Sequence, residues 1–309
     1  MANTIEYASI LQSELDKAAV EIATSGWMEL NDKLIKYNGG ADVKIPALDM
    51  DGLGNYDRQT GFVDGDVNLT WETKTMTQDR GRRFTIDEND VNETNFVLTA
   101  ASVMGEFQRK KVVPEIDAYR YSSIAAQAIA KNKAQYGYTP TETDILQRLY
   151  YDIAAVQDVV GDDTPLVITM ATPIAAILSM SDKLSKKLDV LDFKQGDVTM
   201  KVKALDGQHP IIRAGSGRMK TVYKFRDGKT SGQEKGGFEP DAAAKDINWI
   251  ICPRTLPVAV SRTDKMRIFD PETYQAKRAW AMDYRKYHDL WIPSQQMESM
   301  LVNIKQAKA

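Results

Sequence analysis

Apolar residues near the start of the chain recur every three or four positions, which is the spacing of an amphipathic helix. The pattern predicts a helix over residues 4–24 that ends near Gly26. An extended segment over 42–48 follows, and a glycine-containing loop comes after it. The helix has one apolar face, so we expect it to need a partner surface.

Residues 67–74 alternate between apolar and polar side chains, which is the period of a half-exposed strand. A second strand is predicted around Phe84 and Ile86, after a polar stretch that Gly81 interrupts. Because that stretch reads as a turn, we expect the two strands to pair as one long hairpin.

Helical spacing returns over residues 96–113 and predicts a long, largely covered helix. Pro114 does not fit a helix interior, so it either kinks this helix or opens a second one that runs to about Lys131. Residues 139–142 have the spacing of a capping box, with proline at the first helical position, and predict another helix start.

The second half of the chain predicts short strands with helices between some of them, which makes the fold class α+β. One helix is expected to begin at Thr172 and Pro173, and the glycine-rich segment 226–240 is predicted to be a mobile surface loop. The predicted strands are 166–170, 198–204, 210–213, 247–253, 256–260 and 280–292.

Composition places the chain among ordinary globular proteins, since 43% of its 309 residues are hydrophobic and 27% are charged. The length suggests about two domains. A net charge of -3 argues against nucleic-acid binding over the whole surface, although a local basic patch is compatible with it. No apolar run is long enough to cross a bilayer and the first residues lack a signal-peptide pattern, so we expect a soluble, cytoplasmic chain.

Residues that usually carry catalysis are scarce. The chain has two histidines and one cysteine, too few for the usual zinc site. His209 precedes a proline and His288 lies among aromatic residues, so both are interpreted as structural, and Cys252 as a core residue. Residues 228–230 resemble the end of a phosphate-binding loop but lack its first glycine. We assign no catalytic, cofactor-binding or metal-binding residue and predict a structural or binding protein.

Charge is segregated along the arm predicted over residues 55–87, and an isolated hairpin of this kind is marginal in water. Acidic side chains precede its first strand and arginines crowd the turn before the second. This suits a head-to-tail contact between subunits, with a tryptophan as anchor. A solvated hairpin and a nucleic-acid contact by the arginines are the alternatives. The candidate interface residues are Asp64, Asp66, Trp71, Asp79, Arg80, Arg82 and Arg83.

The order of elements, an amphipathic arm, a long hairpin, a long helix, a mixed α/β region and late strands, resembles the major capsid proteins of tailed bacteriophages, which have the Hong Kong 97-type fold. The match is most specific to siphophages of low-GC Gram-positive hosts. The segments that carry it are 55–58, 61–63, 65–71, 79–84, 106–107, 112–118, 268–271 and 284–291.

The resemblance implies a domain organisation. Residues 1–48 would be an N-terminal arm and 49–87 an extended β-hairpin loop. A peripheral domain would combine the spine helix of 88–135 with the closing strands of 256–309, and an axial domain, including the glycine-rich loop, would occupy 136–255.

The same resemblance implies a function without enzymatic activity. The chain would self-assemble through hexamers and pentamers into an icosahedral phage head that encloses double-stranded DNA and touches it non-specifically. It would assemble in the host cytoplasm, become part of the virion, meet portal and decoration proteins, and have no membrane partner. Because the chain starts close to its arm, a scaffold would be a separate protein or absent. Some relatives crosslink their shells through a Lys to Asn bond; Lys74 lies in the extended loop, but no matching Asn and Glu can be assigned, and we expect Lys74 to be solvated.

Three other functions stay open at the level of sequence. An encapsulin-like nanocompartment shell would package a protein cargo in place of DNA. A nucleic-acid-binding module would bind in a salt-sensitive manner as isolated subunits. An enzyme would require a site that the sequence does not reveal.

Overall fold

The computed structural model describes residues 23–34, 36–37, 42–59, 61–87, 103–181, 188–195, 198–274, 276 and 278–308. The helix predicted over 4–24 lies outside the described residues except at its last two positions. The first part of the helix predicted over 96–113 also lies outside them.

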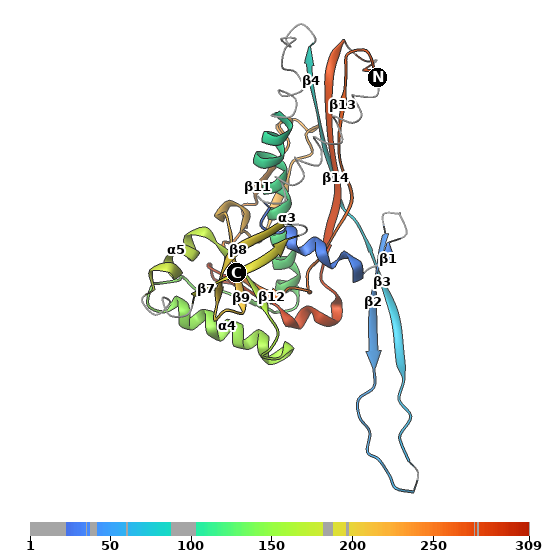
Figure 1. Ribbon diagram of the computed structural model, residues 1–309, viewed down its shortest axis with the longest axis vertical. Coiled ribbons are helices and arrows are strands. Elements are labelled where there is room, and N and C mark those ends of the chain that lie inside the picture. Colours follow the sequence, from blue (N-terminus) through green and yellow to red (C-terminus); the bar gives the residue numbers. More distant parts are fainter. Residues whose placement is uncertain are drawn as a thin grey trace.

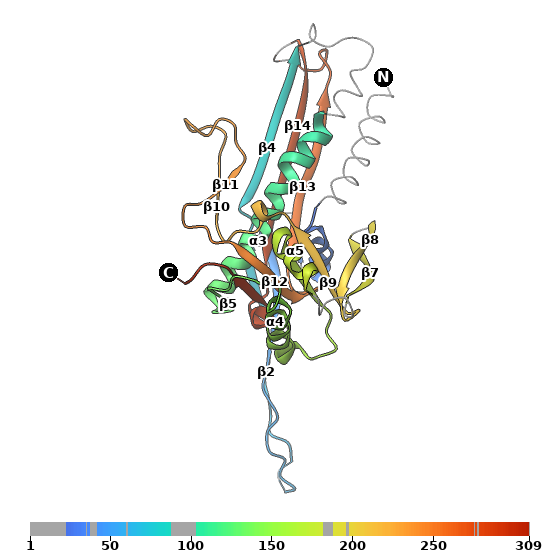
Figure 2. The ribbon, with the colours of Figure 1, turned by 90° about the vertical axis from the view of Figure 1, so that its left-hand side faces the viewer.

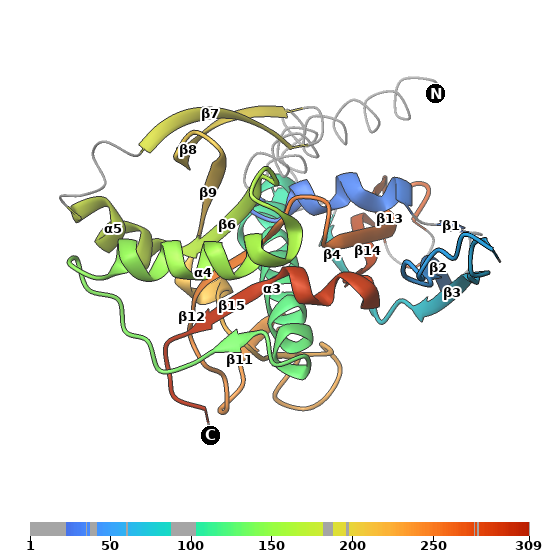
Figure 3. The same cartoon turned by 90° about the horizontal axis from the view of Figure 1, so that it is seen from below.

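A seven-stranded sheet forms the centre of the subunit (Figure 3). Its strands β6 and β12 are buried along their whole length, because helices cover both faces. Helix α3 (Val113–Ala130) packs on one face, and α4 (Ile145–Val160) with α5 (Thr172–Met180) packs on the other. The strand order is β5 (Ala134–Gln135), β15 (Leu301–Ile304), β12 (Ile247–Pro253), β6 (Leu166–Ala171), β9 (His209–Ala214), β8 (Val198–Leu205) and β7 (Leu188–Gln195).

A second, three-stranded antiparallel sheet extends away from this body (Figures 1 and 2). It consists of β13 (Val258–Phe269), β14 (Ala279–Trp291) and β4 (Gln78–Asp87), with β14 in the middle. One face is apolar and packs against the residues that precede α3, including the π-helical turn η3 (Gln108–Val112).

A third sheet carries a hairpin that projects in the opposite direction (Figure 1). It contains β1 (Lys36–Tyr37), β2 (Asp42–Met50) and β3 (Val67–Thr75). The prediction that the strands around 67–74 and 84–86 pair with each other is wrong. Strand β3 pairs with β2, and β4 pairs with β14.

The physical reason lies between the two strands. Met76 is buried against Val258 and Val260, and Thr77 is held by the Asp289 carboxylate, so the chain passes from one sheet into the other without turning back. Gly81 is not a turn residue: a Cβ added there would lie 2.8 Å from the Tyr284 carbonyl oxygen, so glycine permits the close approach of β14.

Most other predicted elements are confirmed. The six strands predicted in the second half are present, α5 begins at Thr172, and Pro114 lies in the first turn of α3. The helix start predicted at residues 139–142 is wrong by more than one helical turn, because α4 begins only at Ile145. The Asp144 carboxylate accepts hydrogen bonds from the backbone and hydroxyl of Thr141 and from Tyr138, which fixes a turn before the helix.

The remaining short elements are η1 (Gly26–Leu34), η4 (Ser216–Arg218), β10 (Tyr223–Phe225), β11 (Phe238–Pro240) and η5 (Ser294–Ser299). No described helix is long and apolar enough to cross a membrane. Within the described ranges no cluster of three or more His, Cys, Asp or Glu side chains could hold a metal ion. Cys252 is buried in the core as predicted, and burial raises the pKa of its thiol to about 12.

Candidate subunit-interaction surface

The base of the β2–β3 hairpin is fixed to the body by one of its faces. Val43 and Ile45 alternate with exposed residues along β2 and are buried. Val43 packs in a small apolar cluster with Met76 and with Val258 and Val260 of β13. The near end of the hairpin is therefore part of the folded subunit.

Farther along, the opposite face of the hairpin is apolar and exposed. Residues that are directly opposite in an antiparallel pair lie on the same face, and here three such pairs follow one another. Leu48, Met50, Val67 and Leu69 are each 46–66% exposed, and Trp71 is 37% exposed. We call this surface the apolar row; it consists of Pro46 opposite Trp71, Leu48 opposite Leu69, and Met50 opposite Val67.

The tip of the hairpin adds further exposed apolar side chains. Phe62 is 88% exposed and contacts the Tyr56 ring, with 4.9 Å between ring centroids. Leu53 and Val63 are also exposed. A contiguous exposed apolar surface of this extent marks an interaction site.

The side chain of Gln295, from η5, holds the hairpin at the middle of the apolar row. Its amide nitrogen donates to the Leu48 carbonyl oxygen at 2.7 Å, and its amide oxygen accepts from the Leu48 backbone nitrogen at 3.2 Å. One side chain thus satisfies both main-chain groups on the outer edge of β2. Nothing in the sequence pattern pointed to this residue.

The end of the hairpin is strongly acidic. Residues 49–66 contain five aspartates against one arginine, Arg58. Asp64 and Asp66 are exposed there as members of this group, and Asp51 accepts a hydrogen bond from the Asp66 backbone at 2.8 Å. We call this region the acidic tip; its aspartates are Asp49, Asp51, Asp57, Asp64 and Asp66.

The predicted interface residues fall into two separate groups. Asp64, Asp66 and Trp71 belong to the hairpin, but the arginines do not crowd its turn, and that prediction is wrong. Asp79, Arg80, Arg82 and Arg83 lie within β4, paired to β14. Arg83 donates to both oxygens of the Asp283 carboxylate at 2.5 and 2.6 Å, and Arg285 binds Asp79 in the same way at 2.8 and 2.6 Å.

Arg80 joins three parts of the chain. It donates to the Glu115 carboxylate of α3 at 2.7 Å and to the carbonyl oxygens of Arg226 and Gly237 at 2.8 and 3.2 Å. Arg82 donates to the Glu234 carbonyl oxygen at 3.1 Å. The segment 226–240, predicted as a mobile surface loop, is thus hydrogen-bonded to β4 at Arg226, Gly237 and Glu234. Together with β10 and β11, which pair with each other, we call it the glycine-rich hairpin.

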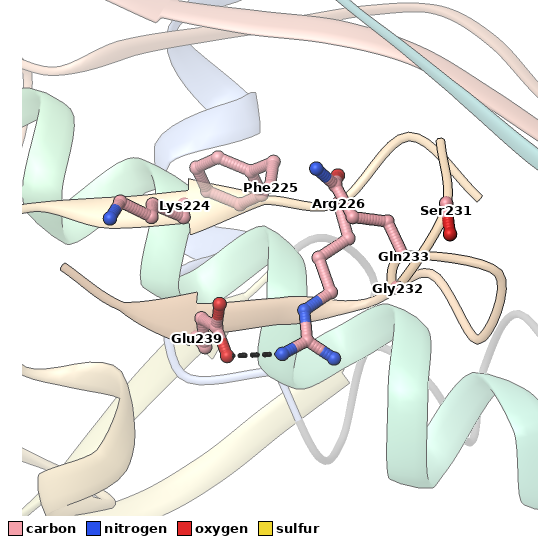
Figure 4. A pocket seen from close by; sticks show the side chains of 7 residues that line it. All are labelled: Lys224, Phe225, Arg226, Ser231, Gly232, Gln233 and Glu239. Atoms are coloured by element: carbon pink, nitrogen blue, oxygen red, sulfur yellow. Dashed lines mark hydrogen bonds and ion pairs between the residues drawn. The ribbon is translucent and has the colours of Figure 1, made fainter. Parts of the chain in front are cut away.

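The same segment lines a cavity of about 450 Å³ (Figure 4). Arg226 points across it and donates to the Glu239 carboxylate at 2.5 Å. Its lining residues are Lys224, Phe225, Arg226, Ser231, Gly232, Gln233 and Glu239.

Replacement of Arg80 should therefore destabilise the subunit itself. We expect Arg80→Met to lower the free energy of unfolding by about 2 kcal/mol, because hydrogen bonds to three acceptors are lost while the aliphatic stem is kept. Arg82→Met should change it by less than about 0.5 kcal/mol, since one exposed bond is lost. Urea unfolding of the isolated subunit measures both, and equal effects would contradict the assignment.

A buried ionic network connects the chain around η1 to α3 and β14, and sequence reasoning missed it. Asp117 is fully buried and accepts hydrogen bonds from the backbone and side chains of Thr24 and Ser25 and from Arg218. Arg120, also buried, donates to Ser25 and to Glu29. Burial alone would raise the pKa of Glu29, but Lys286 and Arg120 lower it to about 2.

His288 lies beside this network and gives it a pH dependence. Its pKa is well below 6.5 because it is buried and because Lys286 and Arg120 are close, against a weaker opposing effect of Glu29. Its Nδ1 has no hydrogen-bond partner among the described residues. His209, in contrast, accepts from the Leu166 backbone at 3.2 Å.

We therefore expect the subunit to lose stability as the pH falls through 6.5. Below that pH the unfolded chain binds a proton at residue 288 that the folded chain does not, so the free energy of unfolding falls by up to about 1.4 kcal/mol per pH unit. His288→Gln should reduce this slope. Urea unfolding at pH 7.5 and 5.5 measures it, and an unchanged slope in the variant would refute the account.

Comparisons with known proteins were made for the sequence and for the structure. No protein-family model matches the chain, and a search of curated protein sequences gives no match. Solved structures do match. The bacteriophage PhiM1 mature capsid covers 86% of this chain and 82% of its own, with a TM-score of 0.56 and 10% identity. Staphylococcus phage Andhra's capsid covers 87% and 81%, with a TM-score of 0.52 and 10% identity.

This chain has the Hong Kong 97-type capsid fold. The resemblance found in the sequence is confirmed at the level of the fold. In this chain the apolar row and the acidic tip belong to one projecting hairpin. The arginines that were predicted on the same arm belong instead to the three-stranded sheet. The assignment to siphophages of low-GC Gram-positive hosts stays a prediction.

A third solved structure also matches. The virus-like particle from Pyrococcus furiosus covers 96% of this chain and 99% of its own, with a TM-score of 0.50 and 11% identity. Likeness at this level of identity concerns the arrangement of elements.

Proposed function

We propose that this protein is the major capsid subunit of a tailed bacteriophage, a structural protein that self-assembles through hexamers and pentamers into an icosahedral head enclosing double-stranded DNA. The observation that carries the proposal is the apolar row, six side chains on one face of a hairpin that leaves the body of a capsid-fold subunit (Figure 1). The fold gives the chain the architecture of a capsid subunit. The exposed apolar row gives a thermodynamic reason for one copy to bind another, because binding would remove apolar surface from water.

Energetics favour a covered hairpin. A two-stranded hairpin is marginally stable in water, and burial of one large apolar side chain contributes about 1.5–3 kcal/mol. A neighbouring subunit that covered the row would supply several such contributions. Asp64, Asp66 and Trp71 are proposed interface residues on this hairpin. Asp79, Arg80 and Arg83 have partners within the chain, so their first role is to hold the subunit together.

The domain organisation is proposed with changed limits. The extended loop corresponds to the hairpin over 42–75, since β2 supplies its first strand. The peripheral domain combines α3 with the β13–β14–β4 sheet. The axial domain is built on the seven-stranded sheet, which includes β15 in addition to the predicted range of 136–255. The glycine-rich hairpin contacts β4 and so bridges the two domains.

The proposal includes partners and location. The subunit would assemble in the host cytoplasm and reside in the virion, with other copies of itself as the main partner. Portal, decoration and separate scaffold proteins, and non-specific contact with packaged DNA, are expected from the same reading. No enzymatic activity, cofactor or membrane contact is proposed.

A nanocompartment shell with a protein cargo is the second candidate, favoured by the full-length match to the Pyrococcus furiosus particle. Electron microscopy of the purified chain tests shell formation, and nuclease-protected DNA in particles from infected or induced cells separates a phage head from a nanocompartment. We expect closed shells and protected DNA. Monomers at high concentration would overturn the assembly proposal, and particles with protein cargo and no DNA would favour the second candidate.

A further inference from the structure

The base of the projecting hairpin is closed by one buried carboxylate and its donors. Thr77 lies between β3 and β4, and its backbone nitrogen and hydroxyl donate to the Asp289 carboxylate at 2.8 and 2.9 Å. Tyr119 of α3 donates its hydroxyl to the same carboxylate. Burial and this hydrogen bond raise the pKa of Tyr119, so its hydroxyl remains a donor at ordinary pH. We call Thr77, Tyr119 and Asp289 the base latch.

The base latch lies directly beside His288. The Tyr119 ring meets the His288 ring edge-on, with 5.5 Å between the ring centroids. In the pairing of β4 with β14, His288 is opposite Gln78, the residue that follows Thr77. His288 is 4% exposed, whereas Tyr119 is half-buried. Tyr119 therefore both completes the latch and covers the histidine.

The surroundings of His288 favour its uncharged form. Burial lowers its pKa most, and the charges of Lys286 and Arg120 lower it further. The nearby carboxylates are already engaged, because Glu29 binds Arg120 and Lys286, and Lys286 also binds Asp264. An imidazolium here would share those carboxylates with the cations that hold them, so it is unfavourable while the site is closed. The titratable and charged groups around His288 are Lys286 and Asp289 of β14, Tyr119 and Arg120 of α3, Glu29 of η1, Arg80 of β4 and, through Lys286, Asp264 of β13.

We propose that protonation of His288 opens the base latch, so that acid frees the base of the hairpin from the body. An imidazolium must be hydrated or paired, and Tyr119 is the cover that moves most readily, because Arg120 and Lys286 are buried in ion pairs. When Tyr119 moves away, Asp289 loses its hydroxyl donor, and water reaches the hydrogen bonds between Thr77 and Asp289. The inference goes beyond the proposed function, since it concerns a single subunit.

Acid should enlarge the open fraction of the latch. An open latch exposes His288 to water, where its pKa is about 6.5, whereas the closed latch keeps the side chain uncharged. The open form therefore binds a proton that the closed form does not, and its population should grow about tenfold between pH 7.5 and 5.5. Hydrogen exchange of the Thr77 amide measures this population, because that amide is bonded to Asp289 only in the closed latch.

Mass spectrometry of peptides that cover residues 75–78 follows this amide in the unassembled subunit, after correction for the intrinsic pH dependence of exchange. His288→Gln should remove the tenfold acceleration. The matched control is His209→Gln, at the other buried histidine, which should keep it. Tyr119→Phe should raise exchange already at pH 7.5, because the hydroxyl bond to Asp289 is lost. Circular dichroism checks that each variant is folded.

An acceleration that persists in His288→Gln would overturn the inference. So would exchange of Thr77 that is no faster than that of the β12 amides, because the latch would then open only when the whole subunit unfolds. If His288→Gln does not fold, an unchanged exchange rate in Tyr119→Phe overturns the inference instead. None of these measurements involves assembly, so their failure is distinct from a failure of the shell proposal.

Discussion

Removal of the acidic tip together with the Met50–Val67 pair of the apolar row is expected to give folded subunits that form no shells. The change replaces residues 49–68 with Asn-Gly, so that Leu48 and Leu69 flank a two-residue turn. The body should keep its stability, because the removed residues make no described contact with either of the other sheets. Analytical ultracentrifugation and electron microscopy measure the loss of assembly.

A point variant makes the same test more sharply. Leu69→Asp places a charge in the middle of the apolar row and should abolish the shell assembly that we expect of the original chain. Thr70→Asp adds the same charge one position away, on the other face of the hairpin and opposite Ala47, and is the control that should still assemble. Shells from Leu69→Asp, or equal loss in both variants, would contradict a role for the apolar row.

The second large effect concerns Asp117, whose replacement by alanine should lower the free energy of unfolding by about 3–5 kcal/mol. The carboxylate is fully buried, and its removal leaves Arg218 and the backbone groups of Thr24 and Ser25 without their acceptor. Chemical denaturation of the unassembled subunit, followed by tryptophan fluorescence, measures the loss.

Arg148→Met serves as the comparison for Asp117→Ala. It also removes one partner of a buried carboxylate, Asp152, but that carboxylate keeps hydrogen bonds from Trp249 and Asn303. We expect Arg148→Met to lower the free energy of unfolding by less than half of the loss expected for Asp117→Ala. A cost for Asp117→Ala below about 1 kcal/mol would mean that water or a rearranged chain satisfies Thr24 and Ser25 in its place.

Local patterns predicted most strands but not their partners. The alternation over 67–74 correctly identifies a half-exposed strand, because period two follows from the geometry of one strand. It says nothing about which strand lies beside it. The partner of β4 is β14, about 200 positions later, where Arg83 meets Asp283. A glycine among arginines looked like a turn, whereas Gly81 is there to admit the backbone of β14.

The candidate surface was predicted in part for the same reason. Val67, Leu69 and Trp71 lie on one face, as the alternation predicts, and the acidic character of Asp64 and Asp66 is evident in the sequence. The charge of Arg80 is also plain in the sequence, but its acceptors come from α3 and from both ends of the glycine-rich hairpin, which only the tertiary fold brings together. Both faces of β2 carry apolar side chains. This pattern in the sequence was the signal that could have identified Pro46, Leu48 and Met50 as the rest of the row.

The position of β14 between β13 and β4 has a consequence for biosynthesis. A strand that pairs with β4 is made only when nearly the whole chain has left the ribosome, and contacts of such high sequence separation form slowly. Until β14 has formed, β4 lacks its partner strand, and Thr77 at the base of the hairpin lacks the Asp289 carboxylate that accepts its hydrogen bonds. The attachment of the hairpin to the body is therefore expected to form late in folding, after β14 has been made.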